Sequence, residues 1–478
     1  MSTPNPNTPP SAVTPAVSPQ ARRVLPFIVG CALFMQMLDS TVVTTALPTM
    51  ALALDSDPVS LNIAITSYLL SLAVFVPISG WAADRYGARK VFMIAIGIFT
   101  LSSLACALSA TLLHLVLSRI AQGMGGAMMV PVGRIILLRT IPKHDLLRAM
   151  AFLSMPALIG PLIGPPLGGF LVTYASWHWI FLINLPIGLF GIWMVRRYVI
   201  ELPPDGLEHP LDFVGFLLSA VCMACLMGGF EALGTSQASW ALTAGLIATG
   251  VTTGALYYWH SKRCPHPILD LTLLSIPTFR ASMLAGNLCR FTIGSSPFLM
   301  AILLQVGFGL SAISAGMITF AGAIGSMAMK FVAPPILRRW GYRNVLTING
   351  ILTAACTVLC IVFTPATPVV VISGVLLLGG FFRSLQFTAV NTLTFADVSH
   401  AGMSRASSFA AMGQQLGVSM GVGVAACTLN ISMSWRHASE LATSDVTAGF
   451  IVIGLICASA SLLFWRMDPM AGESLHRR

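Results

Sequence analysis

Residues 80–90 read GWAADRYGARK, a short charged segment between two long apolar runs. Residues 338–343 read RRWGYR and follow another apolar run in the second half of the chain. The aromatic, glycine and arginine positions of this hexamer match those of residues 84–89, and the acid is lost. Because the two segments hold equivalent places, they indicate an internal duplication, which is how many secondary transporters are built.

The composition of the chain requires a surface that faces lipid. Of its 478 residues, 56% are hydrophobic and 9% are charged, and the mean hydropathy is +0.84. A soluble domain carries about 25% charged residues. The net charge of +10 would suggest nucleic acid for a soluble protein. Here the basic residues stand in short loops between apolar runs, where they indicate membrane topology, and we expect no nucleic-acid partner.

The sequence contains fourteen candidate membrane spans, since a bilayer crossing needs about 20 apolar residues. The seventh and eighth candidates are only weakly separated, around residues 231–240. The candidates begin near Val24, Ser60, Val91, Leu112, Ala149, His178, Leu211, Ala238, Arg280, Ala312, Asn344, Thr367, Ser404 and Val446.

The loop charges orient these spans. With a cytoplasmic N-terminus, the cytoplasmic segments hold 20 of the 26 Lys and Arg residues, and the outer segments hold only Arg436. Positive loops favour the cytoplasmic side, so we expect both termini there, in a bacterial inner membrane. The first run continues past Pro48 without a good cleavage context, and we interpret it as a retained span and not a signal peptide.

These features predict an all-α polytopic membrane protein with two six-helix bundles and two additional helices between them. The first residues are rich in Pro, Ser, Thr and Asn, a composition typical of disorder. The predicted parts are a cytoplasmic tail (1–22), an N-terminal bundle (23–200), an inserted helix pair (201–265), a C-terminal bundle (266–467) and a second cytoplasmic tail (468–478).

Asp39 and Arg119 are the candidate proton-coupling residues. Asp39 is the only acid that we place deep inside a span, and a buried acid in lipid is a functional-site hypothesis by default. Arg119 lies within the fourth span and needs an acceptor inside the bundle, for which Asp39 is the natural candidate. The alternatives are an acid paired for structural reasons near a water-filled vestibule, and a purely structural arginine.

The segment 80–90 is a candidate conformational latch. An ion pair on the cytoplasmic side that opens and closes suits a carrier with two states. The alternative is a loop that only sets the topology. The residues assigned to the latch are Gly80, Asp84, Arg85, Gly87 and Arg89.

The fifth span carries a run of glycines and prolines, GPLIGPPLGG at residues 160–169. Glycines spaced by four form one small-residue face, and prolines kink a helix. We predict that this face packs tightly against the other bundle as a seal or pivot, although simple helix packing is the alternative. The residues are Gly160, Pro161, Gly164, Pro165, Gly168 and Gly169.

Polar residues within spans are candidates for a substrate cavity near the midplane between the bundles. For each residue taken alone, a structural role is the more common one. The spans contain one deep acid and three arginines, Arg119, Arg290 and Arg383. This balance of charge favours anionic or neutral substrates. Arg134 and Lys330 lie near span ends, where we expect their side chains to snorkel towards water. The candidates are Gln36, Thr41, Gln122, Asn287, Arg290, Gln305, Arg383, Gln386 and Asn391.

The remaining motifs give no sign of an enzyme or a metal centre. The ten cysteines are scattered through apolar runs, and Cys222 and Cys225 have no partner pair or histidine cluster beside them in the sequence. No nucleophile–base pair or phosphate-binding loop is visible. We expect no metal and no cofactor, with a proton gradient as the energy source.

Taken together, these motifs resemble the major facilitator superfamily over essentially the whole chain after residue 22. Residues 38–48 (LDSTVVTTALP) and 176–186 (SWHWIFLINLP) resemble the fourteen-span drug:proton antiporters of the EmrB/QacA type, among them the MdtD-like proteins. The resemblance implies a latch at 80–90, proton transfer at Arg119 and an antiporter motif at 160–169. The chain departs from the group at Thr44, commonly asparagine, and at His178, commonly arginine. It also lacks the additional membrane acids of several drug-cation exporters.

The resulting prediction is a proton-coupled exporter of small molecules that works by alternating access, monomeric, with protons, a small-molecule substrate and lipid as its partners. One alternative is a proton-coupled carrier, exporting or importing, for an endogenous and anionic metabolite. An alternative of another class is a membrane sensor or scaffold that does not transport.

Overall fold

The computed structural model describes residues 19–54, 58–201, 210–233, 239–399, 402–437 and 441–472. Helices dominate these residues and no strand occurs among them, so the predicted all-α class is confirmed. Most of both predicted tails lies outside the described residues. The predicted N-terminal tail is too long by a turn, because the first helix begins at Pro19.

The helices follow the predicted order. The N-terminal group comprises α1 (Pro19–Ala53), α2 (Pro58–Phe75), α3 (Ile78–Tyr86), α4 (Ala88–Ala107), α5 (Leu112–Thr140), α6 (Lys143–Tyr174), α7 (Trp179–Leu182) and α8 (Asn184–Tyr198). The middle pair is α9 (Phe213–Ala232) and α10 (Trp240–Arg263). The C-terminal group comprises η1 (Leu271–Ser275), α11 (Pro277–Ile302), η2 (Leu303–Gly307), α12 (Ala312–Trp340), α13 (Tyr342–Leu359), η3 (Cys360–Val362), α14 (Val369–Leu393), α15 (Met403–Trp435) and α16 (Thr443–Trp465).

Eleven of the described helices are long and apolar enough to cross a membrane, and the bent pair α2–α3 brings the number to twelve. Two more helices, α6 and α10, have 32 and 24 residues and lie where the sequence predicts the fifth and eighth spans. The count of fourteen crossings therefore stays a prediction, while a polytopic membrane protein is established.

The second predicted span is broken into two helices. α2 and α3 meet at an angle of 57°, with Pro77 at the break. Proline has no backbone N–H, and its ring crowds the carbonyl one turn earlier, so a helix bends there. The bend turns α3 towards the second half of the chain, where it packs against α15.

The two copies of the charged segment adopt the same backbone. Gly87 joins α3 to α4 with a φ of 86°, and Gly341 joins α12 to α13 with a φ of 74°. In each copy the glycine N–H donates to the carbonyl four residues earlier, over 3.0 Å. A left-handed backbone disfavours residues with a Cβ. The shared glycine of the repeat thus reflects the same tight turn in both halves.

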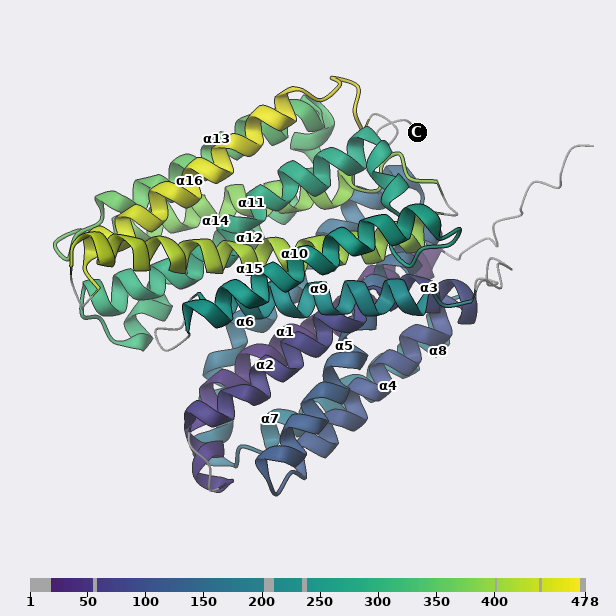
Figure 1. Ribbon diagram of the computed structural model, residues 1–478, viewed down its shortest axis with the longest axis horizontal. Helices are drawn as coiled ribbons and strands as arrows, with labels where there is room; N and C mark the ends of the chain where they lie inside the picture. The colour runs from purple at the N-terminus through teal and green to yellow at the C-terminus, as the bar shows by residue number, and fades with distance from the viewer. Residues whose placement is uncertain are drawn as a thin grey trace, which may run out of the picture.

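The helices form two bundles, with α9 and α10 lying across one side of both (Figure 1). The purple-to-blue helices α1–α8 make one bundle, and α11–α16, in green to yellow, make the other. In Figure 1 the bundles converge near α3 and diverge towards their far ends.

The buried hydrophobic side chains follow the same arrangement, with the two bundles in contact at one end and apart at the other. One hydrophobic cluster includes residues of both bundles, among them Leu25, Phe92, Phe279 and Ala410. Two further clusters each belong to a single bundle. One surrounds Phe181 in the first bundle, and the other surrounds Phe450 in the second. The bundles therefore share a core at one end and keep separate cores at the other.

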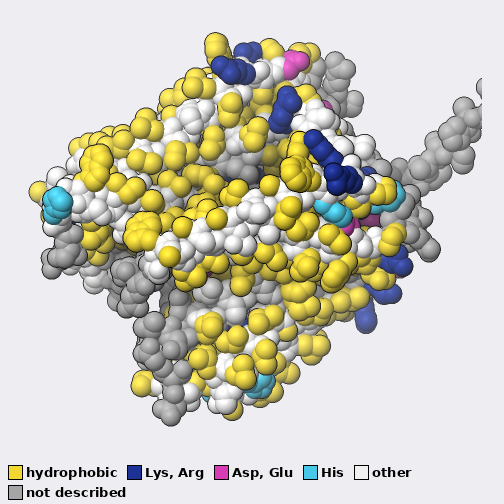
Figure 2. Space-filling model, in the orientation of Figure 1, with side chains coloured by type: hydrophobic (Ala, Val, Ile, Leu, Met, Phe, Trp, Pro, Cys, Tyr) yellow, Lys and Arg dark blue, Asp and Glu magenta, His cyan; other side chains and the backbone are white. Residues whose placement is uncertain are grey.

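The shared core lies at the end that carries the charged loops. Figure 2 shows the dark blue lysine and arginine side chains gathered on one side of the visible face. We call this the basic end. Its arginines and lysines include those in the last turns of α3, α8, α10 and α12, namely Arg85, Arg196, Arg197, Lys262, Arg263, Arg338 and Arg339.

The inserted helix α9 touches both bundles, because it packs against α2 on one side and α15 on the other. At its C-terminal end, Thr66 of α2 donates a hydrogen bond to Glu231 (3.2 Å), and Asn430 of α15 donates to the carbonyl of Leu233 (2.9 Å). Closer to its middle, Met223 and Met227 cluster with Ala73 of α2 and partly buried residues of α15. The pair α9–α10 is thus a bridge and not a separate domain.

Candidate functional site

Asp39 and Arg119 form an ion pair in the interior of the N-terminal bundle. Arg119 Nη1 of α5 lies 2.6 Å from Asp39 Oδ2 of α1. Both residues are 1% exposed. The structure thus brings together the two residues proposed for proton coupling, and the carboxylate compensates the charge of a buried guanidinium that cannot lose its proton.

Three further groups surround the pair. Gln122 Nε2 donates to Asp39 Oδ1 over 2.9 Å, and Asn184 Nδ2 donates to the same oxygen over 3.2 Å. The guanidinium stacks on Tyr68, with its Cζ 4.3 Å from the ring centroid. Both carboxylate oxygens therefore hold hydrogen bonds that suit the ionised form, while any protonation of Asp39 would remove the counter-charge of Arg119.

Asn184 and Tyr68 are functional candidates that the sequence analysis missed, and Gln122 was assigned to the substrate cavity instead. A short break between α7 and α8 places Asn184 at the first residue of α8, fully buried. Asn184 lies in the motif at 176–186 that carries the family resemblance, and it is an amide inside an apolar stretch, but neither signal links it to Asp39. Tyr68 has no such signal, because an aromatic residue in a span is ordinary.

Replacing Asn184 by alanine is expected to lower the stability of the folded protein by about 1–3 kcal/mol, because its amide bonds both Asp39 and Ser103 (3.0 Å) inside the bundle. Thermal unfolding of the purified protein in detergent measures the loss. Asn344 lies exposed on α13, and its replacement by alanine is the control, expected to leave the midpoint unchanged. Equal midpoints for both variants would contradict a supporting role for Asn184.

The latch segment makes contacts across the bundle interface. Arg139 Nη2 of α5 lies 2.8 Å from Asp84 Oδ1 of α3 and donates to Ser404 Oγ of α15 over 2.9 Å. Ser79 and Ser408, also on α3 and α15, share a hydrogen bond of 2.8 Å. Asp84 thus belongs to an ion pair at the basic end that is joined directly to the other bundle.

The other latch residues have distinct positions. Gly80 faces α15 so closely that an added Cβ would lie 2.7 Å from the Ser404 carbonyl oxygen. Gly87 forms the turn described above. Arg85 packs beside the rings of its neighbours Trp81 and Tyr86, and Arg89 donates to the carbonyl of Arg196 (2.9 Å) within its own bundle.

The glycine face of α6 packs against α1, and not against the other bundle. An added Cβ on Gly160 would lie 2.9 Å from Met37 Cβ, and one on Gly164 would collide with Thr41. The prediction of a seal between bundles is therefore wrong for these two glycines. Their spacing by four defines a face of the helix but does not say which neighbour uses it.

The rest of the glycine–proline run divides between buried and open positions. Gly168 is buried, Gly169 is exposed, and the side chains of Pro161 and Pro165 lie outside those that the structure describes. α6 does contact α12 and α14 of the second bundle. Those contacts leave the assignment of residues 160–169 as a motif of antiporters a prediction.

Replacing Gly164 by valine is expected to destabilise the protein by about 1–3 kcal/mol, because the side chain would separate α6 from α1. The matched control is Gly169→Val, five residues further along the same helix, where an added Cβ has nothing within 4 Å. Unfolding midpoints in detergent compare the two. A Gly164→Val protein as stable as Gly169→Val would show that the close packing is unnecessary.

The nine cavity candidates fall into separate places. Gln36, Thr41 and Gln122 belong to the first bundle, where Thr41 donates to the carbonyl of Met37 (2.9 Å) of its own helix. Gln305 is exposed in η2. The structure therefore does not unite the candidates in one site.

The second-bundle candidates other than Gln305 do come together. Arg290 of α11 donates to Asn287 Oδ1 (2.7 Å) and to Asn391 Oδ1 of α14 (2.8 Å). Arg290, Arg383 and Gln386 line one small cavity of about 10 Å³, which has room for about one water molecule. This cavity is the place where the sequence-based candidates and the geometry agree.

The expected snorkelling of Arg134 and Lys330 is wrong. Arg134 is 5% exposed and Lys330 is 3% exposed, so both are held inside the protein. Lys330 Nζ donates to Thr388 Oγ1 of α14 over 2.7 Å. Hydropathy placed both residues near span ends, but only the packing of helices around them could show that their side chains turn inwards.

A second buried acid, Asp445, lies at the start of α16. Its carboxylate pairs with Arg436, accepts from Ser432 (2.6 Å) and accepts from the N–H of Ala442 (2.9 Å). These contacts tie the ends of α15 and α16 together. Asp445 is therefore a structural acid, and Asp39 remains the buried acid in mid-span among the described residues.

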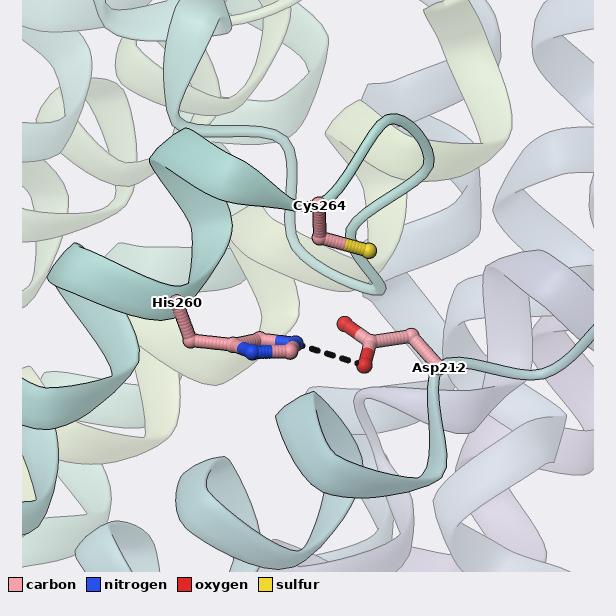
Figure 3. A group of neighbouring side chains, drawn as sticks. All are labelled: Asp212, His260 and Cys264. Atoms are coloured by element: carbon pink, nitrogen blue, oxygen red, sulfur yellow. Dashed lines mark hydrogen bonds and ion pairs between the residues drawn. The ribbon is translucent and has the colours of Figure 1, made fainter.

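Asp212, His260 and Cys264 approach one another where α9 begins and α10 ends (Figure 3). His260 Nε2 lies 2.7 Å from Asp212 Oδ1 (Figure 3), and Asp212 also accepts from the N–H groups of Gly215 (2.8 Å) and Ile268 (3.3 Å). Capping and pairing use both carboxylate oxygens. These contacts join the start of α9 to the end of α10.

Two related helical bundles with a buried ion pair define a polytopic membrane transporter. The sequence model of the Major Facilitator Superfamily matches residues 29–422 and, a second time, residues 282–477. The chain belongs to this superfamily. As a member of a transporter family it is not an enzyme.

Relatives with known names are similar over most of the chain. An MdtD multidrug resistance protein of Cronobacter sakazakii is 38% identical over 462 residues, which cover 94% of this chain and 95% of that protein. An MdtD protein of Salmonella typhimurium is 41% identical over 412 residues, covering 85% and 86%.

Two solved structures show the same fold. The human organic anion transporter MFSD10 covers 94% of this chain and 100% of its own, with a TM-score of 0.67 and 16% identity. The proton:xylose symporter XylE covers 95% and 97%, with a TM-score of 0.65 and 13% identity. At these identities the likeness concerns the fold alone.

Proposed function

We propose that this transporter is a proton-coupled exporter of small molecules that works by antiport across the bacterial inner membrane. The observation that carries the proposal is the buried pair of Asp39 and Arg119, 2.6 Å apart. A protonatable carboxylate with a fixed counter-charge can alternate between an ion pair and a neutral acid as access to it changes. The proton gradient is then the energy source.

The two bundles supply the alternating access. The shared core and the contacts of Asp84, Arg139 and Ser404 hold the basic end together, and the separate cores leave the opposite ends apart. Rocking of one bundle against the other would release the basic end and bring the far ends together. The loop charges support a cytoplasmic basic end with both termini on that side.

The direction of transport is supported by the resemblance of residues 160–169 to the antiporter motif and by the multidrug resistance names of the relatives. The exporter acts as a monomer in this proposal, with a small molecule and protons as its ligands. An endogenous anionic metabolite is the second candidate substrate, and the basic residues around Arg290 favour it.

Proton release from liposomes containing the purified protein tests the proposal. A pH-sensitive dye outside the liposomes reports protons that leave in exchange for each compound of a substrate panel, with Asp39→Asn protein as the reference. We expect exchange with at least one compound in the parent and none in the variant. Identical proton movement in both proteins, or substrate flux that ignores the pH gradient, would refute proton coupling at Asp39.

A further inference from the structure

Four basic side chains of α5, α11, α12 and α14 lie wholly or partly inside the protein. Arg290 of α11, Lys330 of α12 and Arg134 of α5 are 2%, 3% and 5% exposed. Arg383 of α14 is partly exposed. Among the described residues, no acidic side chain forms an ion pair with any of these four. The buried Arg119, in contrast, has Asp39.

The partners of these cations leave donors unused. Arg290 is held by two amide oxygens, those of Asn287 and Asn391, and its Nε has no acceptor in the described part of the chain. The Nε and Nη1 atoms of Arg134 likewise lack acceptors there. A buried guanidinium is costly without an anion, so this arrangement is suited to a ligand that brings the missing charge.

The four side chains come from both bundles, and two of them line one cavity. Arg290 and Arg383 line the same cavity together with Gln386 and Phe387. Lys330 Nζ lies 5.6 Å from the ring centroid of Phe387. Arg134 belongs to the first bundle, but its Cζ lies 5.8 Å from the ring centroid of Phe395 in the second bundle, directly after α14. An anion between them would relieve a repulsion that acts across the bundle interface.

We propose that Arg290, Arg383, Lys330 and Arg134 form the substrate site of this transporter and that the substrate is a small organic dianion with carboxylate or phosphate groups. Arg290 and Arg383 line one cavity, and two guanidinium groups suit two anionic groups of one molecule, since guanidinium binds carboxylate and phosphate in a bidentate manner. The cavity now has room for about one water molecule, so the substrate would enter it when the surrounding helices separate during alternating access. The amide oxygens of Asn287 and Asn391 orient the Arg290 guanidinium for this contact. The inference rests on the proposed transport function and names its substrate class.

Ligand-induced stabilisation of the full chain tests the site. The protein in detergent is unfolded thermally with increasing succinate or inorganic phosphate, with benzoate as a monoanion, and with chloride at matched ionic strength. We expect a saturable rise of the unfolding midpoint with a dianion that chloride does not produce. Arg290→Gln and Arg383→Gln should each weaken the apparent affinity about tenfold or more.

Matched variants separate the site from general charge effects. Arg339 is exposed on α12, and Arg339→Gln should retain the affinity of the parent. Size-exclusion profiles identify any variant that fails to fold, and Arg290→Lys, which keeps the charge, provides a second test at the same position. The proposal would be overturned if neither succinate nor phosphate stabilised the protein. It would also be overturned if Arg290→Gln and Arg383→Gln were stabilised as much as the parent, or if only the cation tetraphenylphosphonium stabilised the protein.

Flux measurements distinguish this inference from the proposed function. Proton-coupled exchange of a cation that depends on Asp39 would refute the dianion site and leave the exporter intact. Binding of succinate or phosphate that requires Arg290 and Arg383, without any proton-coupled flux, would support the site and refute the exporter.

Discussion

Liposomes that contain Asp39→Asn protein are expected to show no proton-driven flux above that of empty liposomes. Asparagine keeps the shape of the side chain but cannot bind and release a proton, and its amide nitrogen cannot accept the hydrogen bonds that one of the Asp39 oxygens accepts. Asp39 is the carboxylate that pairs with Arg119 at 2.6 Å, and no other described acid is buried in mid-span to replace it. Exchange driven by an electrical potential alone, measured in the same liposomes, shows whether the variant still binds substrate.

Substitutions of Asp39 and of Arg119 should lower the stability of the folded protein by different amounts. Asp39→Asn leaves a buried guanidinium that cannot lose its proton, and a cost of about 3–5 kcal/mol is expected. Arg119→Gln leaves a carboxyl that can take up a proton and become neutral, so its cost should be smaller. Unfolding midpoints of the single and double variants measure the coupling. An Arg119→Gln protein less stable than Asp39→Asn would contradict this account.

Gly80→Val is expected to shift the protein away from the state with a closed basic end. An added Cβ would lie 2.7 Å from the carbonyl oxygen of Ser404, so α3 must move away from α15. Overpacking of this kind costs about 1–3 kcal/mol, which corresponds to a population shift of roughly 5- to 150-fold. The transport flux should fall as well, because the protein would spend too little time in the state with a closed basic end.

Distances between the far ends of the bundles report this shift. Spin labels at the exposed positions Leu108 and Val370 lie at the far ends of α4 and α14. We expect a shorter label-to-label distance in Gly80→Val than in the parent. Gly97→Val is the matched control, because an added Cβ there meets nothing within 4 Å. A parental distance distribution in Gly80→Val would show that the close contact of α3 with α15 does not set the conformation.

Hydropathy and loop charge predicted the helical architecture well, because both depend on composition over long windows. Each predicted start among the described residues falls in a helix or directly before one. The bend at Pro77 was not predicted, since proline in a span is compatible with a mild kink or a full break. The bridging role of α9 was also beyond the sequence, because a hydrophobic run does not name its neighbours.

The site was predictable where burial itself constrains the partner. A single mid-span acid and a mid-span arginine of the same bundle had few other ways to be satisfied, so Asp39 and Arg119 could be paired from the sequence. Lys330 and Arg134 could not be placed, because their distance from a span end allows a side chain to reach water or to turn inwards. Asn184 reaches Asp39 across 145 positions of sequence, through a helix break that no local pattern marks.

The surface between α9 and the bundles contains flexible side chains, with Met223 and Met227 of α9 facing Met412 of α15 and Ala73 of α2. Methionine is unbranched and repacks readily. Any rocking of α2 relative to α15 has to slide this surface, whatever molecule is carried. The contacts of α9 with α2 and α15 would therefore affect the rate of the conformational change and not the selection of the substrate.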